Sequence, residues 1–359
     1  MEIKAISTMQ ELLALEPEWQ RLWLCQKRPQ VFQHHAWACA FIASFCPPLT
    51  WKVLVARLDG RVIGLLPLSG DEKTSRWRLL GSPNADYQHL LGDASLICDM
   101  VTHLAAEGAK MLTLEAMPEG QSVWESLQGC GYPLLPVTEP PTCSYMKLTE
   151  ASVTAVQRKS GMKDNERRLA KMGPVEIRVI QGADERLVAL ETLFEQHRLR
   201  GDPQGRPSQV NVPATCEFYR RLCTAPALAT LLHFSVLQVG GRIIACHMGF
   251  VAGDSFIYYK PTYDPAIKGA GQVLMSRLMV EALHMGLKEF DFTRGAEAYK
   301  TGLATGARHN HEARLFFSTS AWLRHLGGEW LRHRVPRDAD GLAITTRLAR
   351  QVRSLMGGH

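Results

Sequence analysis

The sequence lacks the features of a membrane-spanning or disordered protein. It has no low-complexity tract, no long block of like charge, and no run that reaches the roughly 18 apolar residues of a membrane-spanning helix. Its first ten residues include acidic and polar side chains where a signal peptide needs an uninterrupted apolar core. With 46% hydrophobic and 21% charged residues, we expect a globular protein that stays in the cytoplasm.

Paired disulfide and metal-ligand motifs are also missing. The nine cysteines are odd in number and scattered, and no two of them form a Cys-x-x-Cys motif. We therefore expect neither a disulfide framework nor a zinc knuckle, and we interpret most cysteines as small buried residues. His309 and His311 have the alternate spacing of two ligands on one strand face, but no carboxylate or cysteine set accompanies them. The sequence therefore predicts no metal site.

Length and charge set the next limits. A chain of 359 residues exceeds what one hydrophobic core usually organises, which favours two domains. The net charge of +6 is concentrated in residues 158–171 and 324–353, each of which contributes +4. Such runs are usually solvated helix faces. The alternative is a surface for anionic partners, such as the phosphates of a cofactor, an acidic polymer or RNA.

The first half alternates helical and strand-like patterns. Helical periodicity over 9–24 and around 37–45 precedes strand-like segments at 51–57 and 61–68, which the Asp59-Gly60 turn joins into an antiparallel hairpin. Further strands are predicted at 76–80, 87–91, 111–115 and 144–148, and further helices at 94–107 and 121–128.

The second half repeats this order. A glycine turn joins two strands within 231–251, and placing Arg61-Val-Ile over Arg242-Ile-Ile gives an offset of 242 − 61 = 181 residues, half the chain. We therefore expect two similar halves. Their boundary is placed after the strand at 144–148, with a basic helix at 152–172 bridging them.

The segment from 254 to 302 carries the strongest chemical signal. A strand at 254–260, ended by Pro261, leads into a glycine turn and then a helix at 272–286. Glycines at such a turn let the backbone approach a ligand, and the exposed amides of the helix start favour a pyrophosphate. The alternative is that the glycines only form a tight turn. The phosphate interpretation makes binding residues of Lys268, Gly269, Ala270, Gly271 and Gln272.

The chain resembles the Gcn5-related N-acetyltransferase (GNAT) superfamily over roughly residues 30–317. The similar branch is the two-domain one with the BioF2-like and cellulose-biosynthesis-associated acetyltransferases and, more distantly, the Fem-type aminoacyl transferases. One position departs from the family, whose pyrophosphate loop has Gln or Arg where this chain has Ala266. The resemblance is carried by Phe256-Ile-Tyr-Tyr-Lys-Pro-Thr-Tyr-Asp-Pro265, Gly271-Gln-Val-Leu274, Glu289-Phe-Asp-Phe-Thr-Arg-Gly-Ala-Glu-Ala-Tyr-Lys300, Leu79-Leu-Gly-Ser82, Asp86-Tyr87 and Arg167-Arg168.

This resemblance implies an α/β (α+β) fold of tandem GNAT-like domains, each a mixed, mostly antiparallel sheet flanked by helices. Residues 1–149 would form an N-terminal domain on the acceptor side that lacks a cofactor. Residues 150–318 would form the acyltransferase domain, and residues 319–359 a helical, arginine-rich extension. The implied donor is acetyl-CoA or a longer acyl-CoA, with no metal.

Making an amide from a thioester requires a base for the amine and an acid for the departing thiolate. The family often places a tyrosine near the leaving sulfur, which implies Tyr299 as the acid. Asp291 and Glu297 are candidate bases, or they grip a cationic acceptor, while Arg294 and Lys300 are candidate ligands of phosphate or acceptor. The structural alternatives are an Asp291 that accepts loop amides, an Arg294–Glu297 ion pair, and a Tyr299 that belongs to the core.

Asp86 and Tyr87 end a first-half turn and are candidates for an acceptor cleft between the halves. His197, just before the loop 201–207, and Tyr259 with Lys260 complete the predicted substrate-binding set. The loop itself is interpreted as a mobile lid or an ordinary connection.

The implied reaction transfers an acyl group from coenzyme A to an amine, less readily a hydroxyl, of a small molecule, sugar or peptide. DNA is not an expected partner. Two alternatives stay open. One is a Fem-type transferase that uses aminoacyl-tRNA, with the basic helix at 158–171 following RNA phosphates. The other is a non-catalytic module that binds a nucleotide or polysaccharide.

Overall fold

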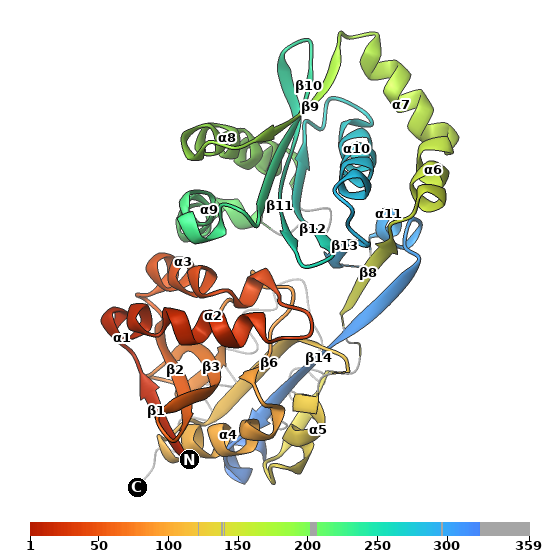
Figure 1. Ribbon diagram of the computed structural model, residues 1–359. Coiled ribbons are helices and arrows are strands. Elements are labelled where there is room, and N and C mark those ends of the chain that lie inside the picture. Colours follow the sequence, from red (N-terminus) through yellow and green to blue (C-terminus); the bar gives the residue numbers. More distant parts are fainter. Residues whose placement is uncertain (121, 138, 140, 202–206, 296, 324–359) are drawn as a thin grey trace, which may run out of the picture.

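The computed structural model describes residues 1–120, 122–137, 139, 141–201, 207–295 and 297–323. The two halves of the chain lie one above the other, and each consists of sheet strands with helices on both faces (Figure 1). The expected α/β class, with mixed, mostly antiparallel sheets flanked by helices, is confirmed. Predictions for residues 324–359, including most of the arginine-rich extension, lie outside the described residues.

In the first half, alternate side chains of one strand reach the two helical layers. Val53 and Val55 of β2 (Thr50–Leu58) pack with α1 (Met9–Ala14), α2 (Glu16–Leu24) and α3 (His35–Phe45), whereas Leu54 and Ala56 pack with α4 (Ile97–Ala106). The other elements are β1 (Glu2–Ile6), β3 (Arg61–Asp71), β4 (Arg76–Leu79), β5 (Leu91–Gly92), β6 (Met111–Pro118), α5 (Ser122–Gly129) and β7 (Leu134–Pro136).

The second half repeats this arrangement. On one face lie α8 (Ala183–Arg200) and α9 (Pro213–Thr224), and on the other α10 (Ala270–His284), with α6 (Glu150–Arg158) and α7 (Ser160–Ala170) packed on α10. The remaining elements are β8 (Thr142–Lys147), β9 (Val175–Ile180), β10 (Leu232–Val239), β11 (Arg242–Ala252), β12 (Ser255–Tyr263), β13 (Glu289–Arg294), α11 (Ala298–Thr301) and β14 (Gly306–Phe316).

The strands of both halves join into one 14-stranded sheet with a symmetric order. Its main path runs β1-β2-β3-β4-β6-β14-β8-β13-β12-β11-β10-β9, so the order of the first half is mirrored in the second. The halves exchange strands at the centre, because β8 pairs with β13 of the second half and β14 pairs with β6 of the first. The predicted boundary at residue 149 divides the chain by position, but the central sheet does not respect it, because strands on each side of residue 149 pair with strands of the other half.

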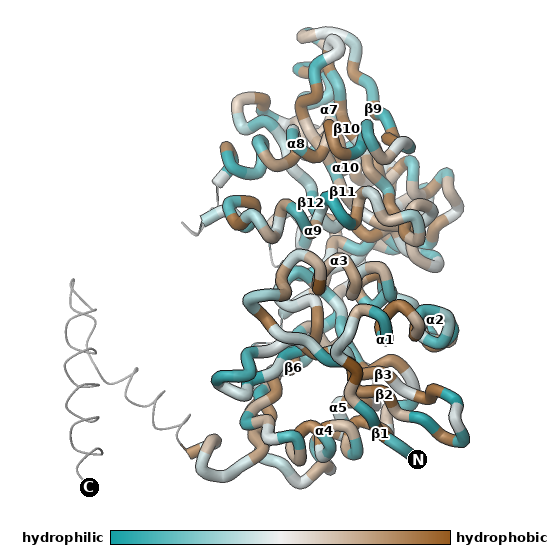
Figure 2. Tube along the Cα trace, turned by 90° about the vertical axis from the view of Figure 1, so that its left-hand side faces the viewer, coloured by the Kyte–Doolittle hydropathy of each residue, from teal (hydrophilic) through white to brown (hydrophobic). Residues whose placement is uncertain are grey.

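The helical layers also meet at the junction of the halves. The helices α3 and α9 lie side by side there, as both views show (Figures 1 and 2). The rings of Trp37 and Phe218 pack edge to face, with centres 5.1 Å apart. One hydrophobic cluster therefore spans both halves and fixes their relative position.

Most predicted elements are confirmed, including the Asp59-Gly60 hairpin, in which both residues have positive φ (50° and 79°). Two strand predictions are wrong. Residues 87–91 form no strand beyond the short β5, because the chain there forms an irregular buried loop. Pro261 does not end β12, which continues to Tyr263. Beyond Ile257, β12 has no ladder partner on its β13 side, where a missing N–H can be tolerated.

Two further expectations need correction. The basic helix at 152–172 is divided into α6 and α7, with Lys159 between them in a non-helical conformation. The expected absence of disulfides is wrong for Cys98 and Cys130, which form one, with Cα atoms 5.1 Å apart, because α4 and α5 pack together. No described helix has the length and apolar content to cross a bilayer.

Candidate active site

The second-half sheet opens where β12 and β13 separate. These two strands pair in parallel only from Ser255–Glu289 to Ile257–Asp291. Beyond this point β12 continues beside β11, while Thr293 adopts a φ of 60°, which is unusual for a β-branched residue and bends β13. The opening therefore leaves backbone of β12 without a neighbouring strand on this side, and nothing in the sequence pattern predicted it.

The start of α10 lies at the end of the same strand. Gly269 precedes the helix with a φ of 91°, and no side chain caps the helix. A Cβ on Gly271 would lie 2.6 Å from the Tyr263 ring, so this position requires glycine unless that ring moves. Among the described residues, the amides of Gly271 and Gln272 have no hydrogen-bond acceptor. Two free amides and the positive end of a helix dipole can hold an anion here.

The loop before α10 is held from one side by α7. The side chain of Asn165 packs against Gly269 and donates to the Gln272 side-chain oxygen. Arg168 donates to Asn165 at 2.9 Å and to the Lys268 carbonyl at 3.4 Å. Lys268 and Gln272 themselves are exposed, whereas Ala270 is buried at the helix start. The basic helix predicted from charge therefore supports the loop directly.

Tyr299, the predicted acid, lies at the rim of the opening. It is 38% exposed, so it is not enclosed in the second core. Burial of its hydroxyl and, secondarily, the carboxylate of Glu297 raise the pKa of Tyr299, while Arg200 opposes this rise. Tyr258 and Tyr263 lie close enough to interact with the same group. Tyr299 is therefore a protonated phenol at neutral pH and can donate a hydrogen bond.

Asp291 is buried between the two halves. The Tyr87 hydroxyl donates to both of its oxygens, at 3.0 and 2.9 Å, and the Thr293 amide donates at 2.8 Å. Arg28 and Arg308 lie 3.5 and 3.9 Å away. Burial raises the pKa of Asp291 to about 6, against the lowering effect of Arg28. The structure thus brings the predicted Asp291 and Tyr87 together through a direct contact between the halves.

The other predicted cations have partners inside the protein. Arg294 lies 3.4 Å from Asp86 and 3.7 Å from Glu312, and donates to the Pro83 carbonyl at 2.9 Å. Lys300 is buried; it donates to the Arg294 carbonyl at 2.8 Å and lies 3.0 Å from Glu297. Glu297 therefore pairs with Lys300 and not, as one structural alternative from the sequence predicts, with Arg294.

The remaining predicted substrate residues line the α8 face of β12. The Tyr259 hydroxyl donates to the Asn84 carbonyl at 2.6 Å, which links β12 to the first-half loop that carries Asp86 and Tyr87. Lys260 is half-buried beside His197. Burial, and then the positive charge of Lys260 and Arg200, lowers the pKa of His197 to about 4. Of the loop 201–207, residues 202–206 lie outside the described residues.

Several residues at this site were missed from the sequence. Arg28 and Arg308 both bind Glu289, next to Asp291, although they lie 261 and 19 residues from Glu289 in the chain. Arg200 lies over the Tyr263 ring, 5.3 Å from its centre. No local pattern marks these arginines. The contact between the halves brings Arg28 and Arg308 to Glu289, and the packing of α8 on β12 brings Arg200 to Tyr263.

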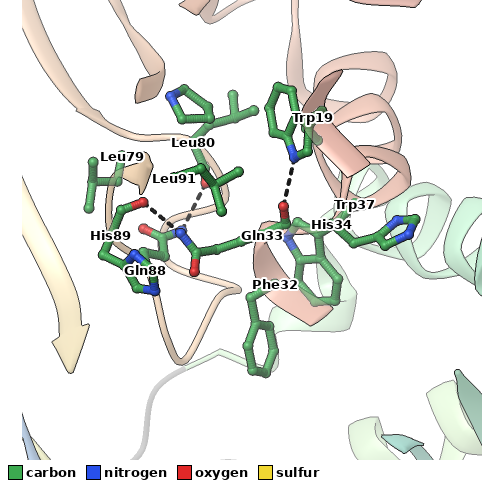
Figure 3. A pocket seen from close by; sticks show the side chains of 12 residues that line it. Trp19, Phe32, Gln33, His34, Trp37, Leu79, Leu80, Gln88, His89 and Leu91 are labelled. Atoms are coloured by element: carbon green, nitrogen blue, oxygen red, sulfur yellow. Dashed lines mark hydrogen bonds between the residues drawn. The ribbon is translucent and has the colours of Figure 1, made fainter. Parts of the chain in front are cut away.

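A separate cavity lies in the first half, close to α2 and α3. Figure 3 shows Gln33 donating to the His89 carbonyl at 2.6 Å, while the Gln33 carbonyl accepts from Trp19 at 2.8 Å. The cavity volume of about 20 Å³ is enough for about one water molecule. Two buried atoms without a partner, Gln33 Oε1 and Trp37 Nε1, belong to residues that line it. This space is too small for a cofactor.

Residues 157–301 match the family model described as acetyltransferase (GNAT) domain. No curated protein matches the chain. Among solved structures, FemX is 10% identical with a TM-score of 0.60, covering 91% of this chain and 99% of its own. A conserved protein of unknown function from Bacteroides thetaiotaomicron is 10% identical with a TM-score of 0.57, covering 88% and 100%. L-PGS from Bacillus licheniformis is 11% identical with a TM-score of 0.54, covering 89% and 97%.

At this identity, the solved structures show the fold alone, over both halves. The family match adds that the second half contains a GNAT-type acyltransferase domain, which includes the helix start, the opening and Tyr299.

Proposed function

We propose that this protein is an acyl-CoA-dependent N-acyltransferase of the two-domain BioF2-like branch, which transfers an acyl group to an amine of a small molecule, sugar or peptide. One observation carries the proposal. The parallel pair β12–β13 opens beside an uncapped helix start, within the segment that matches a GNAT domain.

The residues present fit coenzyme A. The free amides of Gly271 and Gln272 would bind its pyrophosphate, and the exposed Lys268 would add a positive charge. The unpaired edge of β12 after Ile257 offers backbone groups to an extended amide-containing arm. The bound donor supplies an activated thioester carbonyl.

The chain's own residues would manage the protons. The amine attacks the thioester carbonyl carbon, so that a C–N bond forms and the C–S bond breaks. The Tyr299 hydroxyl would then protonate the departing thiolate. Asp291 would accept the proton lost by the amine, because a carboxyl with a pKa of about 6 is mostly ionised at neutral pH yet remains a useful base. Glu297 is less suited to this role, because it is exposed and paired with Lys300.

The direct test is release of free thiol from acetyl-CoA and longer acyl-CoAs in the presence of a panel of amines. Thiol release that depends on the amine, with a mass shift of the acceptor by one acyl group, would support the proposal. Stabilisation against heating by coenzyme A without turnover would instead identify a binding module.

An aminoacyl-tRNA donor is the second candidate. The observation that favours it is the exposed basic face of α7, where Lys163 and Arg167 lie beside the groove between α7 and α10. Transfer from charged tRNA, but not from acyl-CoA, would select this reaction over the first.

A further inference from the structure

Basic side chains gather on the α8 side of the opening, and no carboxylate of the described residues balances them. The Lys260 ammonium lies 4.9 Å from the centre of the Tyr259 ring and donates to Gln209 Oε1 at 3.2 Å, next to η3 (Gln209–Asn211). No carboxylate among the described residues lies within 4 Å of Lys260 or Arg200. The Arg200 Nε is buried and has no hydrogen-bond partner among the described residues.

The nearby acids have other partners. Asp86 is paired with Arg294 at 3.4 Å, and Asp264 with Arg242 at 2.5 Å. Asp291 faces Arg28 and accepts from Tyr87. The positive charge beside the opening is therefore not neutralised by these groups, whereas the junction between the halves is well balanced. An unbalanced, partly buried cation marks a place where a ligand supplies the anion.

The groups around Lys260 form a polar, partly enclosed surface. The ring of Tyr219 lies 5.8 Å from the Lys260 ammonium, and its buried hydroxyl lies next to that of Tyr259. His197 bonds to the Ser208 hydroxyl at 2.7 Å through Nδ1. It is uncharged at neutral pH, because burial and the neighbouring cations disfavour its protonated form. A neutral imidazole and a phenol can donate to an anion without changing the charge of the site.

This surface connects directly to the predicted base. Tyr259, beneath Lys260, binds the Asn84 carbonyl of the first-half loop, and Tyr87 of that loop binds Asp291. The rings of Tyr259 and Tyr87 both pack on Phe32, with centres 5.4 and 6.0 Å away. Packed side chains of both halves therefore link Lys260 to Asp291.

We infer that the acceptor carries an anionic group, a carboxylate or a phosphate, which Lys260 binds while the acceptor amine faces Asp291. The inference rests on the proposed acyl transfer and specifies the substrate class as small amines with a nearby negative charge. Tyr219 and His197 are positioning residues for that group.

Matched acceptor pairs test this inference. Amino acids would be compared with their amides, and aminoalkyl phosphates with the corresponding amino alcohols, using thiol release from acyl-CoA. The variants are Lys260→Met, Lys260→Arg and, as a control, Lys288→Met, since Lys288 is exposed and pairs with Asp254 on the surface. We expect Lys260→Met to raise KM for the charged acceptors about 10-fold or more, because a hydrogen-bonded ion pair is lost. KM for neutral acceptors and for acyl-CoA should not change, and Lys260→Arg should retain the preference.

The outcomes separate the inference from the function beneath it. A charge preference in one pair alone identifies carboxylate or phosphate as the recognised group, and either result supports the inference. Equal use of charged and neutral acceptors by the wild type, or a preference that Lys260→Met leaves unchanged, would overturn it. If no amine releases thiol, the proposed function fails. Titration calorimetry with the charged acceptors then decides the anion site alone, since equal binding by wild type and Lys260→Met would refute it.

Discussion

The two halves share a strand order but differ in what occupies the gap after their parallel strand pair. In the first half, β4 and β6 pair in parallel only from Arg76–Met111 to Arg78–Thr113. The chain then fills the gap itself. The buried loop after β4 lies beside β6, and the backbone amide of Gln88 in this loop donates to the Ala116 carbonyl of β6 at 2.8 Å. In the second half, β12 runs on past the gap, and no described loop takes this place.

The helix that follows each gap differs in the same way. In the first half, the Asp93 carboxylate caps the turn before α4 by accepting from the Ser95 amide at 2.9 Å, which lowers the pKa of Asp93. In the second half, Gly269 stands at the corresponding position of α10 and offers no side chain. One half therefore supplies its own anion and its own filling loop, and the other leaves both places open to the proposed ligand. A repeated fold can keep its sheet while only one copy keeps a binding site.

Closing the second gap should have the largest effect. Gly271→Val would push a side chain into the Tyr263 ring and displace the free amides at the start of α10. We expect affinity for coenzyme A, measured by calorimetry, to fall about 1,000-fold, since two charge-assisted hydrogen bonds are lost. Gly161→Ala on α7 is the control, because nothing lies within 4 Å of the added carbon. Unchanged affinity in a folded Gly271→Val protein would remove the helix start from the site.

The second-largest effect on activity is expected at Asp291, which Tyr87 and Arg28 of the first half contact. Asp291→Asn should reduce kcat/KM about 1,000-fold by removing the proposed base. In the wild type, kcat/KM should rise with pH and level off above about 6, where Asp291 loses its proton. A pH profile of the Asn variant with the same limb near pH 6 would contradict this role.

The same group makes a separate prediction for stability. The folded pKa of Asp291 is raised from 3.8 to about 6, so the folded state holds this proton more tightly than the unfolded state. Its contribution to stability is therefore largest below pH 4 and declines as the pH rises to 6, by up to about 3 kcal/mol. We expect the free energy of unfolding in urea to differ less between pH 4 and pH 7 in Asp291→Asn than in the wild type, because the variant lacks this titrating group.

Removing the acid at the rim should have a smaller effect on turnover. Tyr299→Phe should lower kcat about 100-fold and leave KM for acyl-CoA nearly unchanged, because the phenol would act on the leaving thiolate. Tyr132→Phe in the first half, where the ring packs on Phe317, is the matched control. If both variants retain full kcat, the acid is another group.

The smallest effect is expected from opening the first half. Asp93→Ala removes the built-in carboxylate and should cost about 1 kcal/mol of unfolding free energy, as for other helix caps. Coenzyme A should still bind at one site per chain, because the loop with Gln88 continues to fill the gap. A second binding site in calorimetry would show that the first half is closed by its cap alone.

Local patterns predicted much of this molecule. The hairpin at Asp59-Gly60, the strands on either side of it and the helix after Gly271 all follow from turn residues and periodicity. The loop after β4 was mistaken for a strand, because its apolar residues are buried through packing on β6 and α3 rather than through a ladder. Pattern alone cannot tell these two kinds of burial apart.

Residue patterns along the chain were enough to predict the two similar halves, the glycine turn before α10 and the positions of Asp291 and Tyr299 on consecutive elements. These features depend on contacts between near neighbours in the chain, which propensity and spacing encode. The exchange of β8 and β14, the contacts of Tyr87 and Arg28 with Asp291, and the filling of one gap but not the other depend on how the two halves fold together. Tyr87 and Arg28 lie 204 and 291 − 28 = 263 positions from Asp291 in the chain. The energies of such contacts arise from burial and charge pairing that exist only once the sheet has formed.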